Sequence, residues 1–171
     1  MNEKDVVDLL KKVESIGVNV WITGGWGVDA ILGRQTRPHS DIDFFVQRKN
    51  AGAFIEMIKS NGYCRTKVES DDQSVWCAAH DRTIDLHLFE FAEEGTLRFE
   101  NEIYPSDILN GKGTIGVVTV RCLTAEAQVI YHQGYDQKEK DRHDVLLLCS
   151  TFGFLIPEEY AREKQNNINV Q

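Results

Sequence analysis

Residues 21–45 read WITGGWGVDAILGRQTRPHSDIDFF, and this stretch decides the fold of the chain. The β-branched and aromatic residues of 18–23 predict a strand, which Gly24-Gly25 interrupts. Residues 26–32 are typical of a short helix that ends at Gly33, its expected C-terminal cap. A second strand is expected at 42–46, with two aspartates at its mouth. The stretch therefore places a flexible turn and a carboxylate pair close together.

Chain length and composition indicate a single globular domain. The 171 residues are enough for one substantial core, and 42% hydrophobic with 27% charged residues is ordinary. The formal net charge of −8 argues against a broad nucleic-acid-binding face, and no apolar run approaches a membrane span. We therefore expect no nucleic acid or membrane as partner. The N-terminus, MNEKDVVDLLKK, is a polar amphipathic start rather than a signal peptide, and we expect a cytoplasmic protein.

The four cysteines, Cys64, Cys77, Cys122 and Cys149, are far apart and form no C-x-x-C pair. We expect them to be buried free thiols in a reducing compartment. The five histidines show no ligand spacing beside these cysteines, so a zinc site is not expected.

Hydrophobic periodicity and turn residues predict the remaining elements. Helices are expected at 3–16 and 51–60, and strands at 63–69, 74–79, 83–91 and 114–121, with a hairpin turn at Asp81-Arg82 and a polar, turn-rich segment at 92–113. Thr124 is expected to cap a helix that runs to about residue 132, and Asp136 to open another that runs to about residue 149. The polar tail after Pro157 is expected to fray.

This order of elements predicts an α/β fold of the α+β kind, in which a mixed β-sheet is flanked by helices and followed by a small C-terminal helical lobe. We place the core at 1–122, the helical lobe at 123–156 and the polar tail at 157–171. Trp26 and Trp76 are expected in the core.

The aspartate pair predicts a site for a cation. Asp41 and Asp43 are two residues apart on a strand, so their side chains are expected on one face. Two bare carboxylates this close repel and raise one another's pKa unless a cation lies between them. Mg²⁺ is the natural choice, because hard divalent ions take oxygen ligands. A solvated strand end is the alternative explanation for a lone D-x-D pattern.

Two further features favour the cation site. Strand 83–91 alternates polar and apolar residues, which places Thr83, Asp85 and His87 on one face. If this strand neighbours the D-I-D strand, Asp85 faces the aspartate pair, as a third metal ligand or as the acceptor of a proton from an attacking hydroxyl. The glycine pair lies between a strand and a helix start, where backbone N–H groups and the helix dipole hold phosphate oxygens.

The order of strand, G-G turn, short helix and D-x-D, with a later aspartate strand, resembles the nucleotidyltransferase fold shared with DNA polymerase beta. The closest resemblance is to the lincosamide nucleotidyltransferases. It rests on Trp21, GGWGVD, L-G-R-Q-T-R-x-H and D-I-D, with E-A-Q-x-x-x-H-x-G-Y-D at 126–136. The aminoglycoside 2''-adenylyltransferases share a looser version of the first block. The resemblance covers residues 18–148.

The resemblance implies roles for specific residues. Gly24 and Gly25 would hold the phosphates of the nucleotide. Asp41 and Asp43 would bind two Mg²⁺ ions, and Asp85 would be a further metal ligand or the general base. Polymerase-like relatives carry Gly-Ser in place of the glycine pair, so a hydroxyl contact to phosphate is missing from this chain.

Other charged residues of the first block have competing explanations. Arg37 is a candidate for nucleotide phosphate contact, and His39 is a weaker one. Either residue could instead brace the loop. Asp29 is expected to pair with Arg34 or Arg37.

The C-terminal lobe contributes further candidates. Lys140 lies in a K-D-x-x-D pattern that resembles one on the C-terminal helix of the fold, and it is a nucleotide-binding candidate. Asp144 is expected to form only an i,i+4 pair with Lys140. An acceptor pocket is expected from strand 83–91 and the lobe, with these residues: His87, Tyr131, His132 and Tyr135.

The expected activity is Mg²⁺-dependent transfer of a nucleoside monophosphate, AMP from ATP above all, to a hydroxyl of a small-molecule antibiotic. A lincosamide is the favoured acceptor. Asp85 would withdraw the hydroxyl proton, and pyrophosphate would leave. The alternatives are an aminoglycoside adenylyltransferase and a non-catalytic or protein-modifying, antitoxin-like protein of the same fold. The oligomeric state stays open, with a homodimer as one option.

Overall fold

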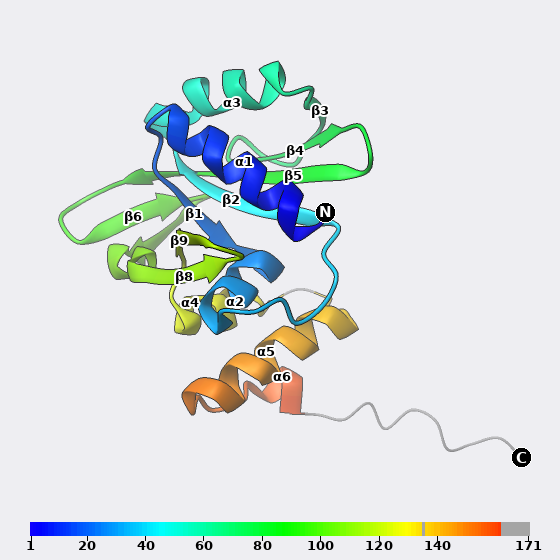
Figure 1. The fold of residues 1–171 in the computed structure, drawn as a ribbon. Coiled ribbons are helices and arrows are strands. Elements are labelled where there is room, and N and C mark those ends of the chain that lie inside the picture. Colours follow the sequence, from blue (N-terminus) through cyan, green and yellow to red (C-terminus); the bar gives the residue numbers. More distant parts are fainter. Residues whose placement is uncertain (135, 162–171) are drawn as a thin grey trace, which may run out of the picture.

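The computed structural model describes residues 1–134 and 136–161, which form a β-sheet with helices on both sides (Figure 1). The helices are α1 (Glu3–Ser15), α2 (Gly24–Leu32), α3 (Ala51–Ser60), α4 (Ala125–Tyr131), α5 (Glu139–Phe152) and α6 (Glu158–Ala161). The strands are β1 (Val20–Thr23), β2 (Asp41–Gln47), β3 (Cys64–Val68), β4 (Gln73–Ala78), β5 (Arg82–Phe91), β6 (Thr96–Phe99), β7 (Glu102–Pro105), β8 (Gly111–Ile115) and β9 (Val118–Cys122). Two 3-10 turns, η1 (Arg48–Asn50) and η2 (Ser106–Asn110), complete the chain order.

The sheet is mixed, as predicted, and β2 lies at its centre. The strand order is β3-β4-β5-β2-β1-β9-β8, with β6 pairing to β5 and β7 to β6. Strand β2 pairs antiparallel with β1 and parallel with β5. The predicted hairpin between β4 and β5 is present, but it turns at His80 and Asp81, both with positive φ, whereas Arg82 of the predicted Asp81-Arg82 turn already pairs with Ala78 in the sheet. The α+β fold class is therefore confirmed.

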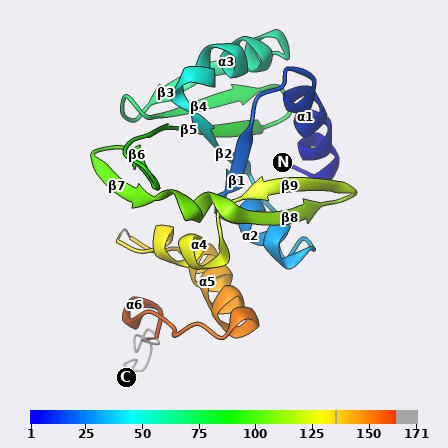
Figure 2. The same ribbon diagram turned by 90° about the vertical axis from the view of Figure 1, so that its left-hand side faces the viewer.

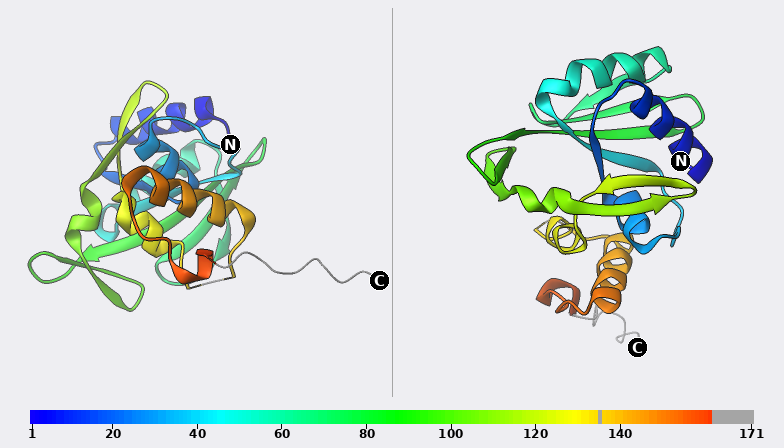
Figure 3. Two further views of the ribbon diagram at one scale, coloured as in Figure 1. Left: turned by 90° about the horizontal axis from the view of Figure 1, so that it is seen from below. Right: turned by 60° about the vertical axis from the view of Figure 1, so that its left-hand side comes forward.

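Helices cover the two faces of the sheet in different ways. Helices α1 and α3 lie over one face, whereas α4, α5 and α6 lie on the other side of the molecule (Figures 1 and 2). Seen from below, α5 runs across the sheet (Figure 3). Trp26 and Trp76 are each 2% exposed and belong to the large core cluster on the α1 and α3 side, as predicted. A separate apolar cluster joins Val28 of α2 to Val145 and Leu148 of α5.

The segment from 92 to 121 differs most from the prediction. Residues 92–113 contain β6, β7, η2 and the start of β8 rather than only turns. The single strand predicted at 114–121 is a hairpin, in which Ile115 pairs with Val118 across a turn at Gly116 and Val117. Gly116 has a φ of 56°, and a glycine at the first of two turn residues is typical of tight hairpins. The β-branched residues on both sides of this turn concealed it in the sequence.

The C-terminal lobe also differs in detail. Thr124 caps α4 as predicted, and its hydroxyl oxygen accepts from the backbone N–H of Ala127 at 3.3 Å. Helix α5 begins at Glu139 instead of Asp136, because the Asp141 carboxylate accepts the Lys138 backbone N–H at 2.8 Å and closes the first turn there.

The prediction of a frayed tail is wrong for residues 158–161. These residues form α6, and Tyr160 is 1% exposed. Its hydroxyl donates to the carbonyl of His132, and its own carbonyl accepts from Arg142. The remainder of the tail lies outside the described residues.

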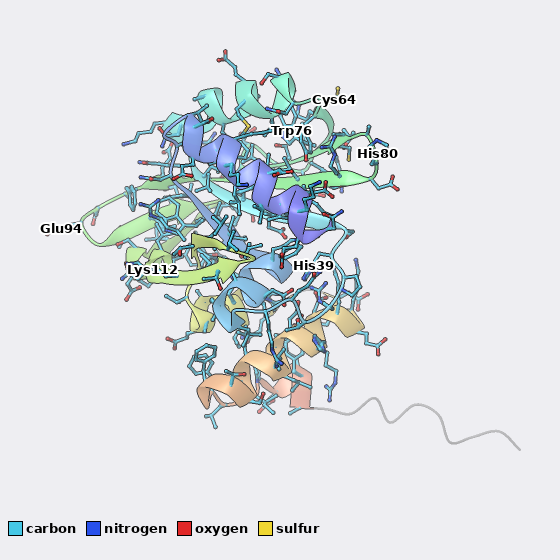
Figure 4. The ribbon with its side chains drawn as sticks, viewed as in Figure 1. His39, Cys64, Trp76, His80, Glu94 and Lys112 are labelled. Carbon is cyan, nitrogen blue, oxygen red and sulfur yellow. The ribbon has the colours of Figure 1, made fainter. Side chains whose placement is uncertain are left out.

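All four cysteines are free thiols, but only two match the expected burial. Cys122 and Cys149 are buried, whereas Cys77 is half-buried and Cys64 is exposed. Cys64 lies on the edge strand β3, whose residues are all exposed, close to the end of α3 (Figure 4). Among the helices that the structure describes, none is both long and apolar enough to cross a membrane.

Candidate active site

The floor of the candidate site is the parallel pair β2 and β5. These strands are neighbours, as the predicted site requires, and their register sets Asp43 opposite Asp85. In the same register Asp41 lies opposite Thr83 and Phe45 opposite His87. Because residues i and i+2 of a strand share a face, all three aspartates lie on one side of the sheet. The reverse side of β2 is the buried core.

The three carboxylates are crowded together on this face. Burial, with the neighbouring charges of Asp43 and Asp41, raises the pKa of Asp85 to about 7. The Oδ1 atom of Asp85 is buried and has no hydrogen-bond partner among the described residues. His87 places Nε2 3.3 Å from Oδ1 of Asp43. The arrangement is electrostatically unfavourable by itself and suits a positive ion.

The three carboxylates do not form a preformed protein cage for a metal ion. Within the described ranges, no group of three or more His, Cys, Asp or Glu side chains could hold a metal ion by itself. Mg²⁺ does not require such a cage, because it is usually bound by one or two carboxylates together with water and substrate phosphates.

The glycine turn lies directly beside the carboxylates. Strand β1 ends at Thr23, and α2 starts at Gly24, which has a φ of 59°. A Cβ atom at Gly24 would lie 2.1 Å from Oδ2 of Asp43, so any side chain here would displace that carboxylate. Thr23 makes no side-chain cap to α2. The first N–H groups of this helix therefore have no side-chain cap from Thr23, and N–H groups at a helix start can bind phosphate.

The loop between α2 and β2 presents Arg37 to the site. Its Nε lies 2.9 Å from Oδ1 and its Nη2 2.5 Å from Oδ2 of Asp144 on α5. A Cβ atom at Gly25 would lie 2.5 Å from Nη2 of Arg37, so the guanidinium rests against the glycine turn. The predicted pairing of Asp144 with Lys140 is wrong. Asp144 is fully buried and lies too deep to serve as the surface partner of a lysine.

His39 braces this loop from inside. Its Nε2 lies 2.5 Å from Oδ2 of Asp29, and its ring lies 4.7 Å from that of Trp26. The other Asp29 oxygen accepts the backbone N–H and the hydroxyl of Thr36. The predicted pairing of Asp29 with Arg34 or Arg37 is therefore wrong. Figure 4 places His39 next to α2, and at 6% exposure it matches the bracing alternative rather than phosphate contact.

One cavity of about 360 Å³ collects the site residues. Ten of the described residues that the sequence predicted for the site line it, whereas the weaker candidate His39 does not; the ten are Gly24, Gly25, Arg37, Asp41, Asp43, Asp85, His87, Tyr131, His132 and Lys140. Tyr135 lies outside the described residues. Lys140 lies one helical turn before Asp144, the partner of Arg37, so Lys140 and Arg37 form a cationic side of the cavity, where Arg37 lies against the glycine turn.

Several lining residues were not found from the sequence: Thr23, Phe45, Gln73, Phe99, Leu123 and Asp141. Phe45 could have been found, because it continues the period-two face of Asp41 and Asp43. Gln73 required the pairing of β4 with β5, in which it lies opposite His87. Phe99 belongs to β6, in a segment that the sequence assigned to turns.

The lining residues divide the cavity into two regions. The glycine turn, Arg37 and Lys140 give one region the chemistry of an anion site. Beyond the carboxylates, the second region is apolar and aromatic, and its members are Phe45, Phe99, Leu123 and Tyr131.

Known proteins share this architecture. The chain is 26% identical over 167 residues to a lincosamide resistance protein of Staphylococcus haemolyticus, covering 88% of this chain and 96% of that protein. A shorter match, 40% identical over 53 residues, links it to a 2''-aminoglycoside nucleotidyltransferase of Escherichia coli, covering 29% of this chain and 30% of that protein.

Two solved structures are similar over most of their length. The lincosamide antibiotic adenylyltransferase LnuA, crystallised with lincomycin, matches with a TM-score of 0.77 and 26% identity, covering 88% of this chain and 98% of that one. ANT(2'')-Ia, in complex with adenylyl-2''-tobramycin, matches with a TM-score of 0.74 and 25% identity, covering 88% and 89%. The family model for aminoglycoside-2''-adenylyltransferases matches residues 5–148. The chain thus belongs to the aminoglycoside-2''-adenylyltransferase family of nucleotidyltransferases.

Proposed function

We propose that this protein transfers AMP from ATP to a hydroxyl group of a lincosamide, with release of pyrophosphate, and thereby inactivates the drug. The observation that carries the proposal is the meeting of three carboxylates with an uncapped glycine turn in one cavity. The lincosamide resistance protein, which matches over almost its whole length, supports the choice of acceptor.

The carboxylates fit Mg²⁺. The unpartnered Oδ1 of Asp85 and the raised pKa of this residue both indicate that a positive charge is needed between it and Asp43. Asp41 and Asp43 would hold the ions, with water and phosphate oxygens as further ligands, and Asp85 beside them would serve as the base. Bound there, Mg²⁺ supplies neutralisation of the charge on the phosphates and on the attacking and leaving oxygens.

The chain's own groups bind and orient the reactants. The first N–H groups of α2, Arg37 and Lys140 hold the phosphates on the cationic side of the cavity. Asp85 accepts the proton of the acceptor hydroxyl, which increases the nucleophilicity of that oxygen as it attacks the α-phosphorus. His87, which is hydrogen-bonded to Asp43, orients the part of the acceptor that carries the reacting hydroxyl.

The apolar region of the cavity favours a lincosamide over an aminoglycoside. A lincosamide combines a sugar with an apolar arm, whereas an aminoglycoside is polar throughout and carries several amines. Phe45, Phe99, Leu123 and Tyr131 provide apolar surface for such an arm. Charge alone does not separate the two classes, because both carry amines.

A substrate screen tests the activity directly. We expect pyrophosphate release from ATP with a lincosamide, and its loss when EDTA removes the divalent metal. All four nucleoside triphosphates should be tried with both antibiotic classes. Turnover with an aminoglycoside and none with a lincosamide would contradict the proposed acceptor and support an aminoglycoside adenylyltransferase. Transfer of label from ATP to a protein, with no drug modified, would indicate the protein-modifying alternative.

Asp85 and Asp43 should respond differently to neutralisation. Asp85→Asn keeps the shape and loses the proton acceptor, so kcat should fall about 10²- to 10⁴-fold with MgATP affinity nearly intact. Asp43→Asn should lower both kcat and the affinity for MgATP, because the phosphates are held through the metal. Calorimetric MgATP affinity and steady-state turnover, measured for each variant, separate the two roles. Near wild-type turnover of Asp85→Asn would exclude this residue as the base.

The raised pKa of Asp85 predicts a pH-dependent stability difference. In the metal-free protein this pKa lies at about 7, against 3.8 for an ordinary aspartate, so the folded state loses stability as pH rises between these values. Asp85→Asn should therefore raise the free energy of unfolding at about pH 8 by about 2 kcal/mol, allowing for the partial exposure of the side chain. At about pH 4 the difference should nearly vanish. Urea denaturation in EDTA measures both, and a pH-independent difference would contradict the burial of this charge.

The apolar region can be probed through the β6 hairpin. Phe99→Ala should raise KM for the lincosamide about tenfold, because it removes a ring from the acceptor region, and KM for ATP should stay unchanged. Phe91→Ala is the matched control, since Phe91 lies close by on β5, is 49% exposed and does not line the cavity. Equal effects of the two substitutions on acceptor KM would remove Phe99 from the binding surface.

A further inference from the structure

One ion pair joins the α2–β2 loop to the C-terminal lobe at the edge of the cavity. Arg37 and Asp144 are 107 positions apart in the chain. Nε of Arg37 lies 2.9 Å from Oδ1 and 3.2 Å from Oδ2 of Asp144, and Nη2 lies 2.5 Å from Oδ2. The Asp144 side chain is fully buried, whereas 17% of the Arg37 side chain is exposed. The pair therefore has a buried anionic end and a cationic end that reaches the cavity.

The guanidinium retains donors that its partners do not use. Arginine carries five N–H groups. One on Nε and one on Nη2 go to Asp144, and one on Nη1 goes to the carbonyl of Pro38 at 3.2 Å. Two N–H groups, one on each terminal nitrogen, have no partner among the described residues. Of these two terminal nitrogens, Nη2 lies beside Gly25, and Arg37 lines the cavity.

A purely stabilising role of this ion pair, as a link between the loop and α5, explains it less well. The contact between α5 and α2 already has an apolar cluster that contains Val28, Val145 and Leu148. A buried ion pair often contributes no more to the free energy of folding than apolar residues of similar size would. Stability alone therefore gives little reason for a charge at Asp144. Asp29 and His39 offer a useful contrast. Both are almost fully buried in the same region, and neither lines the cavity.

We propose that Asp144 is a positioning residue for the nucleotide, which holds the Arg37 guanidinium over Gly25 so that its two remaining N–H groups donate to phosphate oxygens. The proposal rests on the proposed function in taking a nucleoside triphosphate as the ligand. Helix α5 then serves the phosphates twice, through Lys140 directly and, one turn later, through Asp144 and Arg37. The planar fork of arginine suits this task, because one edge can bind a carboxylate while the other binds phosphate.

Nucleotide affinity measured without any acceptor is the first test. Asp144→Asn should weaken MgATP binding about 10- to 100-fold by calorimetry, because it removes the charge that fixes Arg37. In turnover assays KM for the antibiotic should change less than about twofold. Asp29→Asn is the matched control: it also neutralises a buried carboxylate that braces this loop, and MgATP affinity should change less than about threefold. Equal losses in the two variants would mean that loop stability alone sets the affinity.

A double-mutant cycle tests whether Asp144 acts through Arg37. Arg37→Ala should weaken MgATP binding at least as much as Asp144→Asn, and the double variant should bind no more weakly than Arg37→Ala alone. Arg37→Lys keeps the charge and loses the fork, so it should also weaken binding, with folding checked by melting temperature. Additive losses would overturn the positioning role. So would an Asp144→Asn protein that melts earlier but binds MgATP normally.

The two proposals can fail separately. A wild-type protein that binds MgATP through Arg37 and Asp144, yet modifies no antibiotic, would contradict the proposed acceptor and leave the positioning role supported. A protein that adenylylates a lincosamide, with MgATP affinity unchanged by Asp144→Asn, would support the function and overturn the positioning role. A wild-type protein that binds no nucleoside triphosphate would contradict both.

Discussion

The register between the parallel strands β2 and β5 is the constraint on which the site depends. It sets Asp43 opposite Asp85, and it sets Ile42 opposite Ile84 on the reverse face, where both are fully buried. A shift of one residue in either strand would move its carboxylates into the core and its core residues into the cavity. The hydrophobic core under the sheet therefore fixes the position of the carboxylates. Packing of the core holds them close together although their charges repel each other.

The remaining parts of the site are arranged around these charges. Gly24 has no side chain because Asp43 occupies the space that a Cβ atom would need, and α2 begins without a side-chain cap. The loop after α2 returns to the same place, where Arg37 reaches across to Asp144. The anionic floor thus comes from β2 and β5, the amide donors from the start of α2, and the cationic side from Arg37 of the loop together with Lys140 of α5.

Sequence reasoning succeeded where the signal was local. The D-x-D pattern and the alternation of strand 83–91 each follow from the period of two, and the neighbouring positions of the two strands brought Asp85 to the aspartate pair as expected. It failed where a contact joins distant segments. No local pattern pairs Arg37 with Asp144, and the i,i+4 spacing of Lys140 suggested a different partner. Likewise, the polar composition of 92–113 concealed the hairpin that carries Phe99, since exposed hairpins need few apolar residues.

The two regions of the cavity are built from parts with very different freedom to vary. Residues of the floor alternate along β2 and β5 with fully buried core residues, so a change there disturbs packing and chemistry together. The apolar region is built mostly from the periphery: Phe99 from a hairpin that branches off the main sheet, Leu123 from a connection and Tyr131 from the end of α4. Such segments can be exchanged or lengthened without moving the carboxylates. Proteins with this fold can therefore differ in the drug that they bind while they keep the same carboxylates for nucleotidyl transfer. The two relatives solved with lincomycin and with adenylyl-2''-tobramycin share one scaffold in this way.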